Sequence, residues 1–321
     1  MLPLLVFVEV FLFTALALML EWVDRKVYAR VQHRVGPFVT GFKGILQPLA
    51  DFLKLMGKEE VEVEGGDRLI LNLSPPLSLA LVLFALTFIP VVSCRGLLSL
   101  RGDLIILIAI TAVLLAIAMA TGYAQPNPFA YVGAARWAQL FISFEFPFLL
   151  SIASAVMVAG SITLADIIRW QAEHLPLAVF TPLTLVPLVL SVLAELEKAP
   201  FHIPDAETEI AGGWLVDVSG RRLALFRLTK DLELLLLLAL FIDVYLGGPN
   251  GPIIAGLVTL SHGLWFLVKL LVLTVIISYI RGIVARYRID QAIKVLWAWS
   301  VPLAAVNLAA ILIYKILVGL P

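Results

Sequence analysis

Long apolar stretches are the feature that most constrains how this chain can fold. A helix crosses a bilayer with ~20 apolar residues. Hydrophobic residues make up 61% of the 321 residues, more than one soluble core could enclose. The sequence therefore predicts an all-α integral membrane protein, a bundle of about eight transmembrane helices in a single polytopic domain over 1–321. The apolar windows lie near 2–22, 74–93, 103–121, 140–162, 177–197, 228–246, 257–280 and 296–318.

The basic residues are distributed unequally between the two sides of these windows. When alternate loops are assigned to opposite sides, 18 of the 23 Lys and Arg residues fall on one side. Basic loops stay in the cytoplasm, so we expect that side to be cytoplasmic, both termini to lie outside, and the protein to reside in the plasma membrane. The first window lacks the pattern of a cleaved signal peptide and predicts a retained helix. The expected cytoplasmic loops are 23–73, 122–139, 198–227 and 281–295.

The first of these loops contains an apolar pattern of its own. Within 41–60, apolar residues recur at mostly helical spacing, which predicts an amphipathic helix at the membrane interface. The alternative is a connector whose apolar stripe packs on neighbouring spans. The residues concerned are Ile45, Leu46, Leu49, Phe52, Leu53 and Leu55.

Composition excludes several functions. The formal net charge is zero, whereas nucleic-acid binding needs a surplus of clustered basic residues. Cys94 is the single cysteine, so it can form no internal disulfide and no Cys-rich metal site. The sequence also has no Gly-rich phosphate loop, Ser/His/Asp set or metal-ligand spacing. We therefore expect no cofactor on this chain, and we expect any redox centre to belong to a partner.

Carboxylates within the apolar windows gather on the predicted cytoplasmic side. Ionisable groups in a span cost free energy and usually face a polar interior. These acids come from four windows, so a bundle could bring them together in one hydrated funnel, which Lys269 could extend. Alternatively, they cap helix ends, reach towards the interface, or pair with Lys198, Lys230 or Arg227. The acids are Glu21, Glu145, Glu195, Glu197, Asp231 and Glu233.

Other interruptions of the windows have simpler interpretations. Glu9 and Asp243 lie towards the outer side, where either could be an exit group, but we interpret them as simple boundary residues. The stretch 247–252, GGPNGP, predicts a tight outer turn. Pro147, Pro182 and Pro187 predict kinks, which either free carbonyl groups for water or serve only as packing bends.

Five separated blocks together resemble the subunit 1 family of respiratory complex I, the proton-pumping NADH:quinone oxidoreductase. Each block alone is a weak signal, but jointly they are highly specific and span nearly the whole sequence. They are DRKVYARVQHRVGP at 24–37, GILQPLADFLKLMGKE at 44–59, YVGAARWAQLFISFE at 131–145, AELEKAPFHIPDAETEIAGGW followed by DVSG within 194–220, and ARYRIDQ at 285–291.

This resemblance implies a membrane "heel" subunit docked under a hydrophilic electron-transfer arm. Its implied partners are iron–sulfur and large catalytic-type subunits on the cytoplasmic side, and antiporter-like subunits in the lipid bilayer. By motif position it implies an acidic funnel of Glu145, Glu195, Asp205, Glu207, Glu209 and Asp217, to which the charge pattern adds Glu21, Glu233 and Lys269 as a proton path. The residues expected to dock the arm are Arg25, Arg34, Gln47, Asp51, Lys54, Arg136 and His202.

Departures from the complex I pattern indicate a branch of the family. This sequence contains Phe38 where complex I members read GPN, His202 and Asp205 where they read PFD-x-PE, and Asp217-Val218-Ser219-Gly220 where they read EYSG. Lys230 replaces a funnel glutamate. These departures put quinone binding in doubt. The NPFAYVGAARWAQ run and the ARYRIDQ ending are similar to the subunits of energy-converting [NiFe] hydrogenases and archaeal sulfur-reducing complexes.

That branch implies electron flow from ferredoxin to protons or a sulfur compound, with export of H⁺ or Na⁺. Iron–sulfur clusters and a [NiFe] centre would then lie in partner subunits. The leading hypothesis is a non-catalytic coupling subunit. The alternatives are a quinone reductase subunit with its pocket between 23–73 and the 177–197 span, a stand-alone ion transporter, and a passive anchor whose acids only pair with the arm.

Overall fold

In the computed structural model, residues 2–252 and 257–318 are described, and every regular element in these ranges is helical. The longer helices predominate, and short helical turns lie between them. In chain order the elements are α1 (Leu2–Val31), η1 (Phe42–Gly44), α2 (Gln47–Met56), α3 (Arg68–Leu86), α4 (Asp103–Tyr123), α5 (Pro128–Ala159), α6 (Leu164–Glu173), α7 (Leu177–Phe180), α8 (Pro182–Glu195), α9 (Glu207–Ile210), η2 (Gly213–Leu215), α10 (Gly220–Tyr245), α11 (Val258–Ile283), α12 (Ile289–Val295), η3 (Leu296–Ser300) and α13 (Val301–Val318).

The predicted fold class, an all-α membrane protein, is confirmed. By length and composition, five helical segments are long and apolar enough to cross a membrane: α3, α4, α5, α11 and the continuous segment 289–317. Helix α8 is also apolar but has only 14 residues, while α1 and α10 have 30 and 26 residues. The expected count of eight spans therefore stays a prediction.

Several helices extend beyond their apolar windows into regions predicted to be loops. The predicted loop 122–139 is wrong in extent, because α4 continues to Tyr123 and α5 already begins at Pro128. The Asn127 side chain caps α5 by accepting a hydrogen bond from the Phe129 backbone N–H at 3.0 Å. Likewise α1 continues to Val31 and α10 begins at Gly220. Hydropathy locates the apolar part of a helix, whereas capping sets its end.

The structure shows how the segment of the predicted amphipathic helix folds and where the three prolines lie. Within 41–60 the chain forms α2, which leaves Leu53 exposed and buries Pro48. Pro182 follows the non-helical Thr181 and separates α7 from α8. By contrast, Pro147 and Pro187 lie inside continuous helices.

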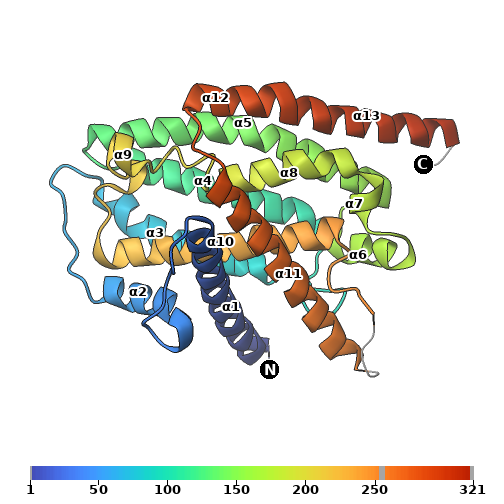
Figure 1. Cartoon of the computed structure of the whole chain (residues 1–321), viewed down its shortest axis with the longest axis horizontal. Helices are drawn as coiled ribbons and strands as arrows, with labels where there is room; N and C mark the ends of the chain where they lie inside the picture. Colours follow the sequence, from blue (N-terminus) through green and yellow to red (C-terminus); the bar gives the residue numbers. More distant parts are fainter. Residues whose placement is uncertain (1, 253–256, 319–321) are drawn as a thin grey trace.

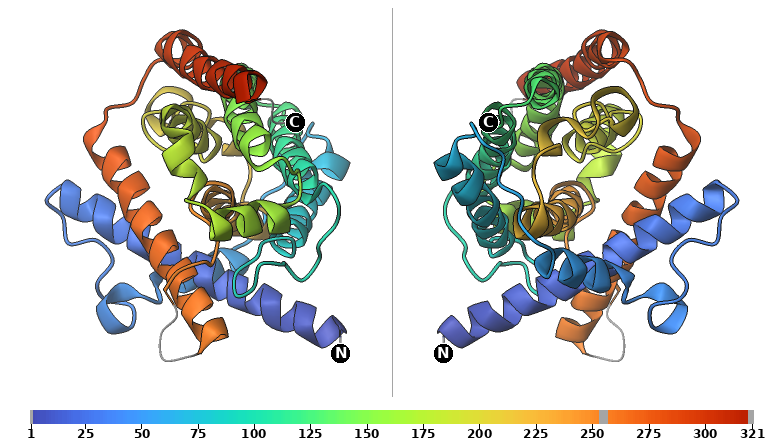
Figure 2. Two further views of the ribbon diagram at one scale, coloured as in Figure 1. Left: turned by 90° about the vertical axis from the view of Figure 1, so that its right-hand side faces the viewer. Right: turned by 90° about the vertical axis from the view of Figure 1, so that its left-hand side faces the viewer.

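Helix α10 occupies the centre of the bundle. Every residue from Leu232 to Tyr245 is buried, and α10 packs against α1, α2, α3, α6 and α11. Helices α5, α8 and α13 pack together at one edge, and α1 and α11 cross at the opposite edge (Figures 1 and 2). The buried middle of α10 thus lies between the helices of the two edges of the bundle.

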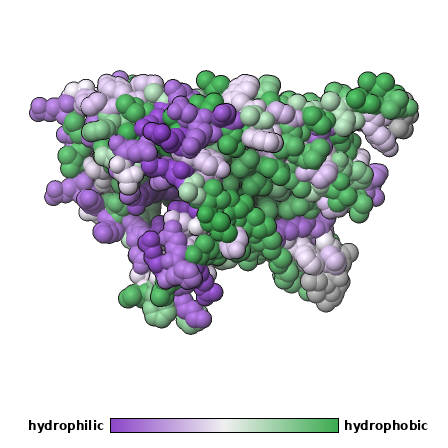
Figure 3. Space-filling view, turned by 45° about the horizontal axis from the view of Figure 1, so that its top comes forward, coloured by the Kyte–Doolittle hydropathy of each residue, from purple (hydrophilic) through white to green (hydrophobic). Residues whose placement is uncertain are grey.

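The two ends of the bundle differ in polarity. One end carries the connections 32–67, 196–219 and 284–288, and we call it the polar end; the other carries 87–102, 160–181 and 246–252, and we call it the far end. Hydrophilic side chains gather at the left of the space-filling view, over the polar end, whereas apolar side chains cover the middle of the molecule (Figure 3). The polar end is the side predicted to be cytoplasmic.

A glycine contact fixes the loop before α10 against the bundle. A Cβ added at Gly133 in α5 would lie 2.6 Å from the Trp214 backbone nitrogen and 2.8 Å from the Gly213 Cα. The close approach places Trp214, which is 2% exposed, between α5 and α10, where its ring contacts Phe226 edge to face. Only glycine allows η2 to lie so close to α5.

We predict that Gly133→Ala destabilises the protein by about 1–3 kcal/mol, the usual cost of overpacking a core. The added methyl group must displace the backbone of η2. A lowered midpoint of thermal unfolding of the purified complex would show this. Gly263→Ala is the matched control, because its Cβ would meet only Val92 Cγ2, at 3.8 Å. Equal midpoints for the two variants would contradict the prediction.

Candidate functional site

A cavity of about 270 Å³ opens at the polar end of the bundle. Ten of its twelve lining residues are charged or histidine, and only Leu196 and Leu234 are apolar. Helices α1, α10 and α11 and the connection after α8 contribute the walls. The charged lining residues and histidine are Glu21, Arg25, Glu197, Lys198, His202, Asp205, Arg227, Lys230, Asp231 and Arg281.

Beside this cavity, a fully buried carboxylate joins three segments of the protein. Asp24 is 0% exposed and accepts hydrogen bonds from Lys198 Nζ at 2.7 Å, Arg281 at 2.6 Å and Ser278 Oγ at 2.5 Å. The guanidinium of Arg281 also lies 4.5 Å from the ring centroid of Tyr28. Asp24 thereby ties α1 to α11 and to the connection after α8. A buried carboxylate with this many donors is a structural clamp.

A second cluster lies deeper in the cavity, around Lys230. Its ammonium forms a short ion pair with Glu197 and lies 3.8 Å from Asp205 Oδ2. Nδ1 of His202 lies 2.9 Å from Asp205 Oδ1 and 2.9 Å from the Glu197 carbonyl oxygen. Contact with Asp205 raises the pKa of His202 above its ordinary value. The side chains of His202, Asp205, Lys230 and Glu197 thus form one cluster of contacting ionisable groups.

A row of carboxylates continues from this cluster into the apolar bundle. A small cavity of about 30 Å³, large enough for one water molecule, lies between Glu197, Lys230 and Glu233. The charge of Glu197 acts on Glu233, and the charges of Glu233 and Glu145 act on Glu195. In the described structure, both carboxylate oxygens of Glu195 are buried without a hydrogen-bond partner. We call Glu197, Glu233, Glu195 and Glu145 the carboxylate row.

Other residues predicted for the proton path lie away from the carboxylate row. Glu207 is exposed in the first turn of α9. Glu209 is exposed and bridges Arg136 at 2.6 Å and Arg286 at 2.5 Å, and the hydrogen bond from Arg136 lowers its pKa. Asp217 accepts a hydrogen bond from Asn127 Nδ2 at 3.2 Å.

Lys269 also lies away from the row, because it donates to backbone carbonyls at the far end. Glu21 does line the cavity, where it pairs with Arg25 at 2.7 Å.

The residues predicted to dock an arm divide into free and internally bound groups. Arg34 and Lys54 are exposed at the polar end. Arg25, by contrast, binds Asp51 at 2.6 Å, and Gln47 donates to Asp51 at 2.8 Å, so these three side chains join α1 to α2. Arg136 is held by Glu209, and His202 lines the cavity.

Sequence reasoning missed the central position of several charged residues. The sequence places Asp24 only within a motif and indicates Lys198 only as a candidate partner for acids, whereas Lys230 is indicated both as such a partner and as the replacement of a funnel glutamate. No local signal identifies these ion pairs, because Asp24 is 174 residues from Lys198 and 257 residues from Arg281. The replacement of a glutamate by Lys230 was the one available signal.

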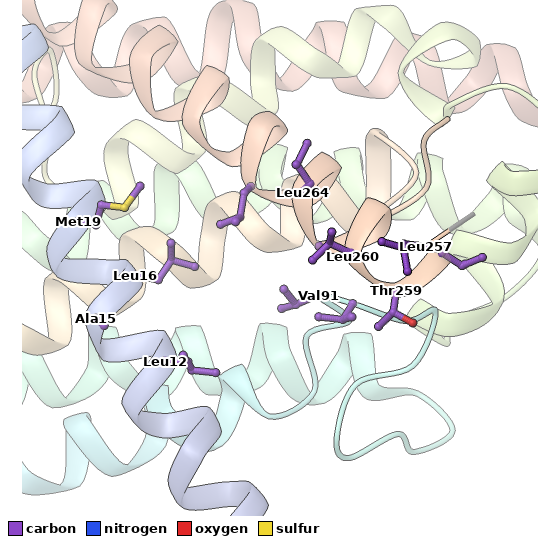
Figure 4. Close-up of a pocket in the computed structure, with 13 residues that line it drawn as sticks. Leu12, Ala15, Leu16, Met19, Val91, Leu257, Thr259, Leu260 and Leu264 are labelled. Carbon is purple, nitrogen blue, oxygen red and sulfur yellow. The ribbon is translucent and has the colours of Figure 1, made fainter. Parts of the chain in front are cut away.

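A larger cavity, of about 1140 Å³, has a different character. It is a groove between α1, α11 and residues 91–92, lined by apolar side chains such as Leu12, Leu16, Leu260 and Leu264, with Thr259 as the polar exception (Figure 4). Such a surface suits hydrocarbon. Within the described ranges, no group of three or more His, Cys, Asp and Glu residues is placed to hold a metal ion. The charged cavity and the carboxylate row are therefore the candidate site.

Comparison with known proteins identifies the family to which this helical architecture belongs. The sequence profile described as NADH dehydrogenase matches residues 3–312. The chain is 32% identical over 308 residues to the H subunit of the NADH-quinone oxidoreductase of Thermomicrobium roseum, covering 90% of this chain and 88% of that protein. It is also 32% identical over 298 residues to an H subunit of the NADH-quinone oxidoreductase of Syntrophobacter fumaroxidans, with the same coverage.

A solved structure matches equally completely. It belongs to the membrane-bound sulfane sulfur reductase, an archaeal respiratory membrane complex, with a TM-score of 0.87, 26% identity, and coverage of 97% of this chain and 99% of that chain. The fold and these comparisons define a membrane-embedded subunit of a multi-subunit, complex I-like respiratory oxidoreductase. The chain belongs to the NADH dehydrogenase family. The resemblance predicted from the five sequence blocks is confirmed.

We predict that Asp24→Asn costs about 3 kcal/mol, because it removes the buried counter-charge of two partly exposed cations, Lys198 and Arg281. The mutant complex should lose yield and thermal stability. Asp166→Asn serves as the control, since the contacts of Asp166 with Arg169 at 3.4 Å and with Ser161 Oγ at 3.3 Å are exposed. If size-exclusion profiles and unfolding midpoints of the Asp24 variant match those of the control, Asp24 is not a clamp.

We also predict a pH dependence for the connection 196–212. The folded pKa of His202 is raised, so its contact with Asp205 stabilises the connection fully below the unfolded pKa of about 6.5 and is lost as pH rises through the folded value. Corrected for intrinsic rates, hydrogen exchange of 196–212 should accelerate over that interval. His202→Gln should abolish the change, whereas replacing the exposed His33 should not. An unchanged pH profile in the His202 variant would refute this.

Proposed function

We propose that this chain is the coupling subunit of a ferredoxin-dependent membrane-bound hydrogenase or sulfur-reducing complex. It docks a hydrophilic electron-transfer arm at its polar end and passes protonation changes inward along the carboxylate row. The observation that carries this proposal is the contact of His202, Asp205, Lys230 and Glu197 with one another, together with the small cavity that Glu197 and Lys230 share with Glu233; Glu195 and Glu145 extend this set within the range of their charges.

The chemistry of the row suits transfer of protons. Neighbouring carboxylates in a low-dielectric site have several protonation states of similar free energy, so a small change in nearby charge shifts a proton from one group to the next. Glu195 supports this role because its buried oxygens have no fixed donor in the described structure. A carboxylate held by permanent ion pairs, such as Asp24, could not respond in this way.

The polar end supports docking of an arm. The exposed side chains of Arg34 and Lys54 lie beside apolar residues that are also exposed, including Phe38, Val39 and Phe42. A mixed apolar and basic surface of this kind is typical of a protein interface. Iron–sulfur clusters and a [NiFe] centre, if the complex contains them, would belong to the docked subunits, and antiporter-like subunits would receive the protonation change in the membrane.

The charged cavity favours the hydrogenase and sulfur-reducing branch. Sites for small organic ligands are lined mainly by apolar and aromatic side chains, whereas ten of the twelve residues around this cavity are charged or histidine. Quinone reduction remains the second candidate because relatives at 32% identity are named NADH-quinone oxidoreductases. The match to a sulfane sulfur reductase supports the first candidate.

We predict that Glu195→Gln and Glu145→Gln each abolish most of the H⁺ or Na⁺ gradient formed per electron, while the complex still assembles. Glutamine keeps the shape of the side chain but cannot bind and release a proton. The gradient is measured with the purified complex in liposomes, using pH-sensitive and Na⁺-sensitive dyes. Glu173→Gln, an exposed change at the far end, is the control. Undiminished gradients in both row variants at normal assembly would disprove the coupling role.

A further inference from the structure

A second buried carboxylate lies at the far end, where the sequence predicted a boundary residue. Asp243, in the last turn of α10, is 0% exposed, and both of its carboxylate oxygens lack a hydrogen-bond partner in the described structure. The turn after α10 folds over it. Gly248, at φ +56°, lies so close that an added Cβ would be 3.1 Å from Asp243 Oδ1. Asp243 is therefore enclosed by the protein and does not face solvent.

The same turn holds a cation. Lys269 Nζ, from α11, donates to the carbonyl oxygens of Leu246, Gly248 and Asn250, each at 2.8 Å. Gln171 in α6 supports the turn by donating to the carbonyl oxygens of Asp243 and Val244 at 3.0 and 3.2 Å. In Figure 1 this end of α10 lies beside α6. The Lys269 ammonium is thus held next to Asp243 by neutral acceptors.

The charged groups around Asp243 come from three helices. Lys269 of α11 and Asp103 of α4 act on it directly through space, and Asp166 of α6 acts on Asp103. The Asp103 carboxylate itself is occupied, because it accepts the Leu164 backbone N–H at 2.8 Å. Of these groups, Lys269 alone is a cation, so it is the group able to neutralise Asp243.

A buried carboxylate without hydrogen bonds is costly unless it carries a proton or contacts a cation. Asp243 can either carry a proton or contact Lys269. The contact is possible because lysine places its charge on a flexible four-carbon stem. In one state Asp243 is a neutral acid and Lys269 stays on the turn carbonyls. In the other state the O–H bond breaks, the proton passes to water at the far end, and the Lys269 ammonium moves to the carboxylate left behind.

We propose that Asp243 and Lys269 form a proton-release site at the far end, so that protons leave through this chain itself. The site is separate from the carboxylate row: Asp243 follows Glu233 by ten residues of α10, which is about 15 Å along the helix axis. The partly exposed residues Asn250 and Gly251 in the covering turn provide the contact with the exterior.

The proposal is tested by labelling the intact complex with dicyclohexylcarbodiimide, an apolar reagent that reacts with protonated carboxyl groups in apolar surroundings. Peptide mass spectrometry then measures the labelled fraction of Asp243 between pH 6 and pH 9. We expect labelling to fall as pH rises. In Lys269→Met it should persist to higher pH, because no ammonium remains to stabilise the carboxylate. Lys269→Arg should restore the wild-type profile, and replacing the exposed Lys58 at the polar end with Met should not change it.

Infrared difference spectroscopy gives a second measurement that needs no reagent access. Among the protonated-carboxyl C=O bands that decrease with rising pH, one should be present in the wild type and absent in Asp243→Asn, whereas the bands of the carboxylate row should remain. Labelling and an infrared band that depend on neither pH nor Lys269 would indicate a static acid and overturn the proposal. Absence of both signals would overturn it as well.

The same labelling in Glu195→Gln separates this proposal from the coupling role. Asp243 should titrate unchanged there whether or not that variant forms an ion gradient.

Discussion

The free energy needed to bury charge in an apolar bundle is the constraint on which the rest of this structure depends. At the polar end, ion pairs and hydrogen bonds between charged side chains offset this free energy. Asp24 alone contacts Lys198, Arg281 and Ser278, and so connects α1, α11 and the segment after α8. These three segments are also walls of the charged cavity. Removing the shared carboxylate would leave Lys198 and Arg281 without the acceptor that holds these walls together.

Paired and unpaired carboxylates divide the molecule into a fixed part and a responsive part. Asp24, Asp51 and Glu209 are held by arginine or lysine, and their charges are permanent parts of the architecture. Glu195 and Asp243 have no such donors among the described residues, so each depends on its protonation state for its stability. Lys230 links the two groups of carboxylates. It pairs with Glu197 and also faces Asp205 and the small cavity beside Glu233.

The sequence predicted the membrane class, the amphipathic α2 and the inward position of Glu145 and Glu195, because hydropathy and depth along a helix are local properties. It failed where distant segments decide the result. The pairing of Glu197 with Lys230 crosses 33 residues, and the burial of Asp243 depends on how the turn at Gly248 folds back. Helix ends were also misplaced, since the cap at Asn127 lies outside any apolar window. Glu207 was predicted from a motif but lies exposed. A motif fixes the position of a residue in the chain but not the residues that surround it in space.

The departures from the complex I pattern make physical sense as one coordinated change. A lysine at position 230 alone would bury an unpaired cation, and a histidine at position 202 alone would leave Asp205 with a weaker partner. Together they place two proton-binding bases around Asp205, and Glu197 balances the added charge. The lining of the cavity is thereby mainly charged, and Glu197 and Lys230 line both this cavity and the small one beside Glu233. Membership of the family accounts for the helical fold of this subunit. The different charged residues within one cavity change the chemistry that this fold can support.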